Sequence, residues 1–364
     1  MNASPQLDRV STFLEKGQAQ GVAAALSAAV MADGDLVHLS WHGRAQVLPN
    51  VRPLAPGDLF DVASLTKVMA TATLAALMMD GGELVLDAPA ARWLPTLAGE
   101  KARITIRHLL VHASGLPAWR PLHASARGRE AVLAAALETP LEASPGTRAV
   151  YSDLGFIALG AILEAVGGEP LDRLFERRIA GPFSLKSTFF LPGRDPAMVA
   201  RRRVEHAFVA ARLSPERGLI CGEVDDDNAW AMGGVGGHAG LFSTALDVAR
   251  FGQGWLLALK GCSLLSQATA RAFVARDPTP GSDRALGWDT PSRSGTTLGT
   301  RLGRGSLGAV GHLGFTGTSL WLDLDRQVVC ALLTNHVHPS GQNKQRINAF
   351  RARFHDAVAE GLGL

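Results

Sequence analysis

The sequence predicts an α+β fold: an antiparallel sheet flanked by terminal helices, with an inserted helical lobe and a functional site in the cleft between the two. Each end of the chain has a helix-like segment beside two short apolar runs, and the middle is a succession of helical patterns. Hydrophobic residues make up 47% of the 364 residues, enough for one large core. We expect a single domain over residues 1–364, with the sheet lobe at about 1–60 and 285–364 and the helical lobe with its cleft loops at about 61–284.

The N-terminal end predicts a helix followed by a β-hairpin. Residues 7–15 place Leu and Val side chains at helical intervals. Two apolar runs follow, 22–31 and 36–41, and the sequence Ala-Asp-Gly-Asp at 32–35 separates them. A turn sequence between two apolar runs is typical of a hairpin.

The C-terminal end repeats this arrangement in the opposite order. Residues 318–324 and 328–334 are apolar runs on either side of Asp-Arg-Gln, and residues 345–362 again have a helical pattern. We therefore expect the two ends to form one antiparallel sheet covered by the terminal helices.

The middle of the chain changes character. Helical patterns separated by glycine and proline predict a helical lobe, with helices at 65–79, 106–111, 129–137, 154–166 and 171–179. A cleft between two such lobes is a usual place for a small-molecule site.

The overall charge argues against a nucleic-acid-binding protein. The formal net charge is only +3, and the three arginines at 201–203 form the only compact basic run. A nucleic-acid interface needs a longer basic face, so we interpret this run as a solvated loop.

The cysteines favour a reducing compartment. Cys221, Cys262 and Cys330 are odd in number, widely spaced and without a C-x-x-C, which argues against a disulfide framework or a zinc cluster. Residues 1–10 lack the features of a secretory signal, and no apolar run reaches membrane-spanning length. We expect a cytoplasmic protein with no membrane span, or a periplasmic one if a leader has been removed.

Ser64-Leu65-Thr66-Lys67 is an S-x-x-K element at the start of the most strongly helical stretch. The spacing places the hydroxyl and the amine on one face of a helix, one turn apart. The helix N-terminus stabilises a developing anion, and a desolvated lysine loses its proton more easily and acts as a base. The motif alone is weak, because an ordinary helix N-cap with an exposed lysine has the same pattern.

Tyr151 is the only tyrosine in the chain, and it follows Pro145-Gly146 just before a predicted helix. A phenol at this place can take the serine proton or pass one to a leaving group. The structural alternative is a half-buried packing tyrosine.

A third element is the glycine-rich segment 311–317, which contains His312, Gly314 and Phe315 and leads into an apolar run. Glycines there let an acyl substrate lie against a strand edge, and the N–H groups of Phe315 and Ser64 form a candidate oxyanion hole. His238 begins a rival H-x-G in the glycine-rich segment 233–240, but no clear strand follows, so we interpret it as part of a cleft-lining loop.

Together these motifs resemble the serine β-lactamase and penicillin-binding superfamily, nearest to its branch of class C β-lactamases, D-alanyl-D-alanine carboxypeptidases, D-aminopeptidases and esterases. The resemblance covers nearly the whole chain, including segments 104–116 and 233–244. It implies a sheet lobe with an inserted helical lobe, as expected above, and serine hydrolase chemistry.

Two residues depart from the pattern of that branch. Asp153 stands where asparagine is usual, and a carboxylate accepts hydrogen bonds where an amide also donates them. His312 stands where its β-lactamases usually carry lysine, so a permanent positive charge is missing. We expect an imidazolium at His312 to favour carboxylate-bearing substrates at low pH, with the preference falling between about pH 5.5 and 8.

Other signals carry less weight. His108 and His112 have a helical metal-ligand spacing but no H-E-x-x-H, and we interpret them as structural. Asp225, Asp226 and Asp227 are interpreted as a polar loop near the cleft. We expect no metal and no cofactor, and the chain has no nucleotide-binding motif. It also has no G-x-S-x-G, which argues against the nucleophile elbow of an α/β-hydrolase.

The sequence therefore predicts a serine hydrolase that forms an acyl-enzyme on a small ester, amide or D-amino-acid-containing peptide. Ser64 is the expected nucleophile, Lys67 and Tyr151 share the proton transfers, and His312 and Asp153 orient the substrate. The alternatives are β-lactamase or penicillin-binding carboxypeptidase activity, an acyltransferase, and a non-catalytic ligand sensor.

Overall fold

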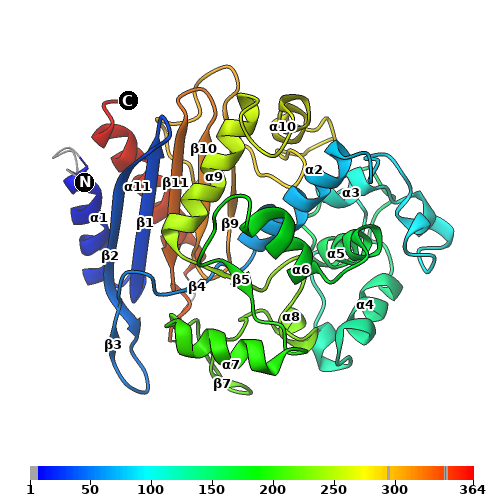
Figure 1. Ribbon diagram of the computed structural model, residues 1–364, viewed down its shortest axis with the longest axis horizontal. Coiled ribbons are helices and arrows are strands. Elements are labelled where there is room, and N and C mark those ends of the chain that lie inside the picture. The colour runs from blue at the N-terminus through cyan, green and yellow to red at the C-terminus, as the bar shows by residue number, and fades with distance from the viewer. Residues whose placement is uncertain (1–6, 293–295, 340, 342) are drawn as a thin grey trace.

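The protein is described by a computed structural model over residues 7–292, 296–339, 341 and 343–364 (Figure 1). A six-stranded antiparallel sheet has the strand order β3-β2-β1-β11-β10-β9. Its strands are β1 (Ala25–Ala32), β2 (Asp35–Gln46), β3 (Arg52–Pro53), β9 (Ala309–Leu313), β10 (Ser319–Asp323) and β11 (Val328–Thr334).

The centre of this sheet joins the two ends of the chain, and it confirms the predicted fold class. Strand β1 pairs with β11 from Leu26 opposite Thr334 to Ala32 opposite Val328. The β1–β2 and β10–β11 hairpins occupy the predicted apolar runs. Strand β9 lies at the sheet edge and was not predicted as a strand, because its glycine-rich sequence resembles a loop.

Strand β11 separates two hydrophobic cores. Val329, Ala331 and Leu333 belong to the core shared with the helical lobe, and Cys330 and Leu332 belong to the core under the terminal helices. Successive side chains of a strand point to opposite faces, so burial on both faces produces a continuous apolar run.

The terminal helices α1 (Asp8–Ala19) and α11 (Lys344–Gly361) pack together against one face of the sheet (Figure 1). The rings of Phe13 and Phe350 stack with centroids 4.7 Å apart. Helix α9 (Ala245–Leu259) crosses the other face, where it contacts β1, β10 and β11. A Cβ atom on Gly252 would lie 2.6 Å from Val329 Cγ1, so this glycine permits the close approach of helix and sheet.

The helical lobe contains the predicted helices and several that were not predicted. Predicted helices correspond to α2 (Thr73–Asp80), α3 (Ile106–Leu110), α4 (Arg129–Glu138), α5 (Asp153–Gly167) and α6 (Leu171–Phe175), with π-helical segments at Lys67–Ala72 and Glu176–Ala180. Helices α7 (Pro196–Glu205), α8 (Asp227–Ala231), α9 and α10 (Gln267–Val274) were not predicted. Short 3₁₀ helices lie at Ala90–Arg92, Gly99–Arg103 and Leu122–Ala124.

Two small sheets lie outside the main one. Strands β4 (Phe60–Asp61), β8 (Leu241–Ser243) and β5 (Phe189–Phe190) form one, and β6 (Leu213–Ser214) and β7 (Gly218–Leu219) form the other.

The three arginines at 201–203 were wrongly interpreted as a loop. They lie on α7, where Asp195 accepts a hydrogen bond from Met198 N at 3.0 Å and Pro196 occupies the first turn. An N-cap and a proline at the helix start explain why this polar segment is helical.

Among the described residues, no single helix is both long and apolar enough to cross a membrane. Helix α5 and the segment Leu171–Ala180 reach the length and apolar composition of a membrane span only when taken together, and the pair is bent by 73°.

Candidate active site

Ser64 lies in a tight turn between β4 and a π-helical segment. Ala63 has a φ of +48°, a conformation that is uncommon for residues other than glycine, and its N–H donates to Asp61 Oδ1 at 2.8 Å. The helix that follows is π-helical over Lys67–Ala72, and Thr73 Oγ1 donates to Val68 O at 2.7 Å. Such wide turns occur frequently at functional sites.

Lys67 is fully buried beneath Ser64 and has three oxygen neighbours. Its Nζ lies 2.9 Å from Ser64 Oγ, 3.1 Å from the carbonyl oxygen of His238 and 2.7 Å from Asp153 Oδ1. The S-x-x-K spacing therefore produces the predicted contact between hydroxyl and amine.

The charge state of Lys67 differs from the expectation. Burial acts to lower the Lys67 pKa, but the neighbouring Asp153 and the Tyr151 hydroxyl outweigh it, and the pKa is raised above its ordinary value. The prediction of a lysine that readily loses its proton is wrong, because the Asp153 carboxylate compensates the buried ammonium.

Tyr151 is held between two cations. Lys67 Nζ lies 4.8 Å and the Arg284 guanidinium carbon 5.0 Å from the centroid of its ring, and the His112 ring lies 4.5 Å away. Burial raises the Tyr151 pKa, and the smaller opposing effects of Lys67 and of the Ser64 hydroxyl do not reverse this. Tyr151 is therefore a protonated phenol beside the Ser64 hydroxyl.

His112 packs against the Tyr151 ring and binds the backbone of the next residue. Its Nδ1 accepts a hydrogen bond from Ser152 N at 3.0 Å, and the Ser152 hydroxyl caps α5 by accepting from Gly155 N at 3.1 Å.

The other histidine of the pair, His108, lies in α3, where its Nδ1 accepts from Thr105 N in the capping box. In the described parts of the chain, no group of three His, Cys, Asp or Glu residues is placed to hold a metal ion.

His312 lies on β9, opposite Leu320, and is 1% exposed. Its Nδ1 donates to the carbonyl oxygen of Leu313 at 3.0 Å, so Nε2 is an acceptor, and within the described structure this buried atom has no hydrogen-bond partner. Burial lowers the His312 pKa to about 4. The expected imidazolium is therefore wrong for neutral pH: His312 is a neutral acceptor.

The turn after β9 is tied to the segment that carries Ser64. Thr316 Oγ1 donates to Asp61 O at 2.8 Å, and Thr318 Oγ1 donates to Val62 O at 3.0 Å. These two threonines were missed by the sequence analysis, since nothing local marks a hydroxyl that pairs with a carbonyl some 255 residues earlier. Among the hydrogen bonds of the described residues, the N–H groups of Ser64 and Phe315 donate none.

Arg351, also missed, supports this turn from α11. It is 4% exposed, and its Nη2 donates to Gly314 O at 2.9 Å and to Thr318 O at 2.8 Å. Burial lowers the Arg351 pKa to about 10, which still leaves the guanidinium charged at neutral pH.

A cavity of about 760 Å³ brings the predicted residues together. Ser64, Tyr151, Asp153, His312, Gly314 and Phe315 all line it, and Lys67 lies directly beneath. The remaining lining residues include Trp119, Arg212, Asp225, Asp226, Asp227, Arg284, Asp289, His336, Lys344, Asn348 and Arg351.

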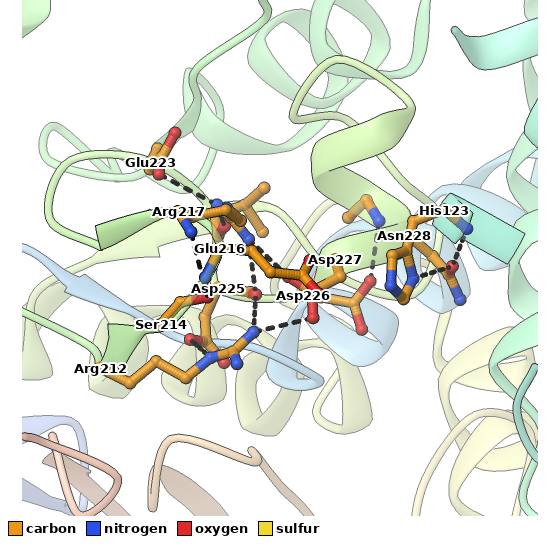
Figure 2. A network of polar contacts seen from close by, with 12 residues as sticks. His123, Arg212, Ser214, Glu216, Arg217, Glu223, Asp225, Asp226, Asp227 and Asn228 are labelled. Atoms are coloured by element: carbon orange, nitrogen blue, oxygen red, sulfur yellow. Dashed lines mark hydrogen bonds and ion pairs between the residues drawn. The ribbon is translucent and has the colours of Figure 1, made fainter. Parts of the chain in front are cut away.

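Asp225, Asp226 and Asp227 belong to the cavity wall, and Asp227 begins α8 (Figure 2). His238 is 1% exposed and lies behind this wall, where its Nε2 pairs with Asp226 Oδ1 at 2.8 Å. Because its carbonyl oxygen also accepts a hydrogen bond from Lys67, His238 connects the acidic loop to Lys67.

The model of the family described as Beta-lactamase matches residues 8–353. The chain belongs to the beta-lactamase family. An amidase of Bacillus subtilis (strain 168), "N-acetylmuramyl-L-alanine amidase", is 31% identical over 92% of this chain and 82% of its own length. A protein of Escherichia coli (strain K12), "Putative D-alanyl-D-alanine carboxypeptidase", is 32% identical over 81% of this chain and 73% of its own length.

Solved structures share this fold at low sequence identity. EstCE1, a hydrolase with promiscuous acyltransferase activity, has a TM-score of 0.75 at 21% identity, covering 97% of this chain and 98% of its own. A class C beta-lactamase has a TM-score of 0.75 at 17% identity, covering 99% and 97%. The chain is accordingly a serine hydrolase of the beta-lactamase type.

Proposed function

We propose that Ser64 is the nucleophile of an acyl-enzyme reaction on a small ester, amide or D-amino-acid-containing peptide. The observation that carries this proposal is the contact of 2.9 Å between Ser64 Oγ and Lys67 Nζ at the wall of the substrate-sized cavity. A ligand sensor has no need of a nucleophile in contact with a buried, carboxylate-paired lysine, so the geometry favours catalysis.

The proton path begins with a charged lysine. Lys67 first gives one of its protons to Asp153 Oδ1, 2.7 Å away, and the amine so formed takes the proton of Ser64 Oγ as this oxygen bonds to the acyl carbon. Lys67 is thus an ammonium before and after this step. Tyr151 donates its hydroxyl proton to the leaving group and regains one from Lys67, which in turn regains its proton from Asp153.

The N–H groups of Ser64 and Phe315 stabilise the oxyanion that develops on the carbonyl oxygen. Water then attacks the acyl carbon, and the same groups carry one proton of this water to Ser64 Oγ as its bond to the acyl carbon breaks. His312, as a neutral acceptor in the cavity wall, receives a hydrogen bond from a substrate N–H or O–H.

The proposed substrates follow from the cavity and from the relatives. The relatives' names include an amidase and a carboxypeptidase, and the structural neighbour EstCE1 is a hydrolase with acyltransferase activity. A neutral His312 supplies no fixed charge for the carboxylate of a β-lactam, so we place β-lactam turnover below ester and amide turnover.

We also propose that residues 1–364 act as one catalytic domain, since strand β9, α11 and the helical lobe all contribute to the cavity wall. The three unpaired cysteines support a reducing, cytoplasmic compartment for this protein.

The test is covalent labelling. Treatment with a fluorophosphonate is expected to add one label, and peptide mapping to place it on Ser64. The same protein is expected to hydrolyse p-nitrophenyl acetate, and Ser64→Ala to abolish both the label and the hydrolysis. A label on another serine, or full hydrolysis by Ser64→Ala, would overturn the proposal.

A further inference from the structure

Two carboxylates in the cavity wall each keep one oxygen open. Asp153 uses Oδ1 for Lys67, and Asp226 uses Oδ1 for both His238 Nε2 and Ala229 N, each at 2.8 Å. Oδ2 of either residue takes part in none of the hydrogen bonds found within the described ranges. The two side chains are 17% and 23% exposed, so the open oxygens can meet a ligand in the cavity.

The neighbouring arginines do not neutralise Asp226. Arg212 pairs with Asp225 at 2.6 Å and with Asp227 at 2.9 Å, and Arg217 pairs with Asp227 at 2.9 Å and with Glu223 at 3.2 Å. Figure 2 shows these contacts, and none of its dashed lines joins either arginine to Asp226. The two arginine side chains are therefore paired with the carboxylates on either side of Asp226 and not with Asp226.

The aromatic residue Trp119 lies on a short segment whose backbone contacts Asp153 on one side and Asn228, near Asp226, on the other. Asp153 N donates to Ala118 O at 2.9 Å, and on the other side Asn228 Nδ2 donates to Arg120 O at 2.9 Å. Trp119, between these two contacts, is 44% exposed and lines the cavity. Trp119 therefore lines the same cavity as Asp153 and Asp226.

We propose that this end of the cavity binds a protonated amine on the acyl part of the substrate. An ammonium group has three donors and no acceptor, which matches two open carboxylate oxygens, and an indole face attracts a cation. An N-acylated amine at the same place lacks the positive charge. A carboxylate there is repelled by the two aspartates. The inference rests on the proposed function and narrows its substrates to acyl groups with a free amine.

The experiment uses the full chain and a matched pair of probes, D-alanine methyl ester and N-acetyl-D-alanine methyl ester. Each is added as a competitor of p-nitrophenyl acetate at pH 6.5, where the free amine is charged, and the concentration that halves turnover of the chromogenic ester is measured. This readout works whether a probe is cleaved or only bound. In the wild type, the free-amine ester is expected to compete at least fivefold better.

Asp226→Asn is expected to bring the ratio of the two probes towards one. Asparagine keeps the N-cap of α8 and still accepts from Ala229 N, so the variant removes the charge and retains the fold. Asp227→Asn is the matched control, with the same loss of charge in the adjacent residue, whose oxygens Arg212 and Arg217 occupy. It is expected to keep the preference for the free amine.

The outcomes separate the two proposals. Equal competition by both probes in the wild type, or equal effects of Asp226→Asn and Asp227→Asn, overturns the amine site while ester hydrolysis stands. Ester hydrolysis that survives in Ser64→Ala overturns the proposed function itself.

Discussion

Replacing Asp153 with asparagine tests the proton path directly. The Lys67 ammonium is fully buried, and Asp153 Oδ1 at 2.7 Å is its carboxylate partner. Removing one partner of a buried pair costs about 3 kcal/mol, the lower end of the usual range, because the Asp153 side chain is 17% exposed. In Asp153→Asn, Lys67 avoids this cost by releasing its proton and becoming neutral, because burial lowers the Lys67 pKa once the carboxylate that raises it is gone.

The expected result is a change in the pH profile. In the wild type, kcat/KM for p-nitrophenyl acetate is expected to be flat from pH 6 to 9, because Lys67 stays protonated. In Asp153→Asn it is expected to fall about 100-fold at pH 7, the scale of losing a positioned proton acceptor, and to rise towards pH 9 as neutral Lys67 becomes the base.

The assay subtracts the spontaneous hydrolysis measured with Ser64→Ala at each pH. Asp58→Asn is the control, because Asp58 pairs with Arg52 at 2.8 Å and lies outside the cavity lining. It is expected to lower stability without changing the shape of the profile. A kcat/KM for Asp153→Asn within threefold of the wild type at pH 7, with a flat profile, would refute the role of Asp153 in proton transfer.

Three further predictions concern Tyr151, His312 and Gly252. Tyr151→Phe is expected to lower kcat for an amide substrate about 100-fold or more with an unchanged circular dichroism spectrum, and near-normal kinetics would make Tyr151 a packing residue. The preference for carboxylate-bearing over neutral esters is expected to be flat between pH 5.5 and 8, because the His312 pKa of about 4 means that the imidazolium forms only as the pH falls through 4. His312→Lys is expected to raise that preference about tenfold, and a wild-type preference that falls across the neutral range would contradict a neutral His312. Gly252→Ala is expected to lower the free energy of unfolding by about 1–3 kcal/mol in urea titrations, because the added Cβ would lie 2.6 Å from Val329 Cγ1, and an unchanged midpoint would show that α9 moves without cost.

The sequence by itself determined the features that depend on short-range periodicity. The spacing of Ser64 and Lys67 predicted that the two side chains meet one helical turn apart, and the turn at Ser64 with the helix after it brings them to 2.9 Å. The apolar runs at both ends, each pair separated by a turn sequence, likewise predict hairpins, and the shared pattern predicts one sheet. Strand β9 escaped prediction because it lies in a glycine-rich segment: Gly311, which permits a close approach to Trp321, is also typical of loops.

Only the tertiary structure decided the charges of the site. Asp153 could be recognised in the sequence as a departure from asparagine, but not as the partner that keeps Lys67 protonated. The sequence does not show whether a histidine at position 312 is exposed and charged or, as in this structure, 1% exposed and neutral. The reason is physical: a pKa depends on how much water and which charges surround a group, and both are set by contacts between segments far apart in the chain. The same holds for Asp226, since only the fold shows that Arg212 and Arg217 pair with its neighbours and not with Asp226 itself.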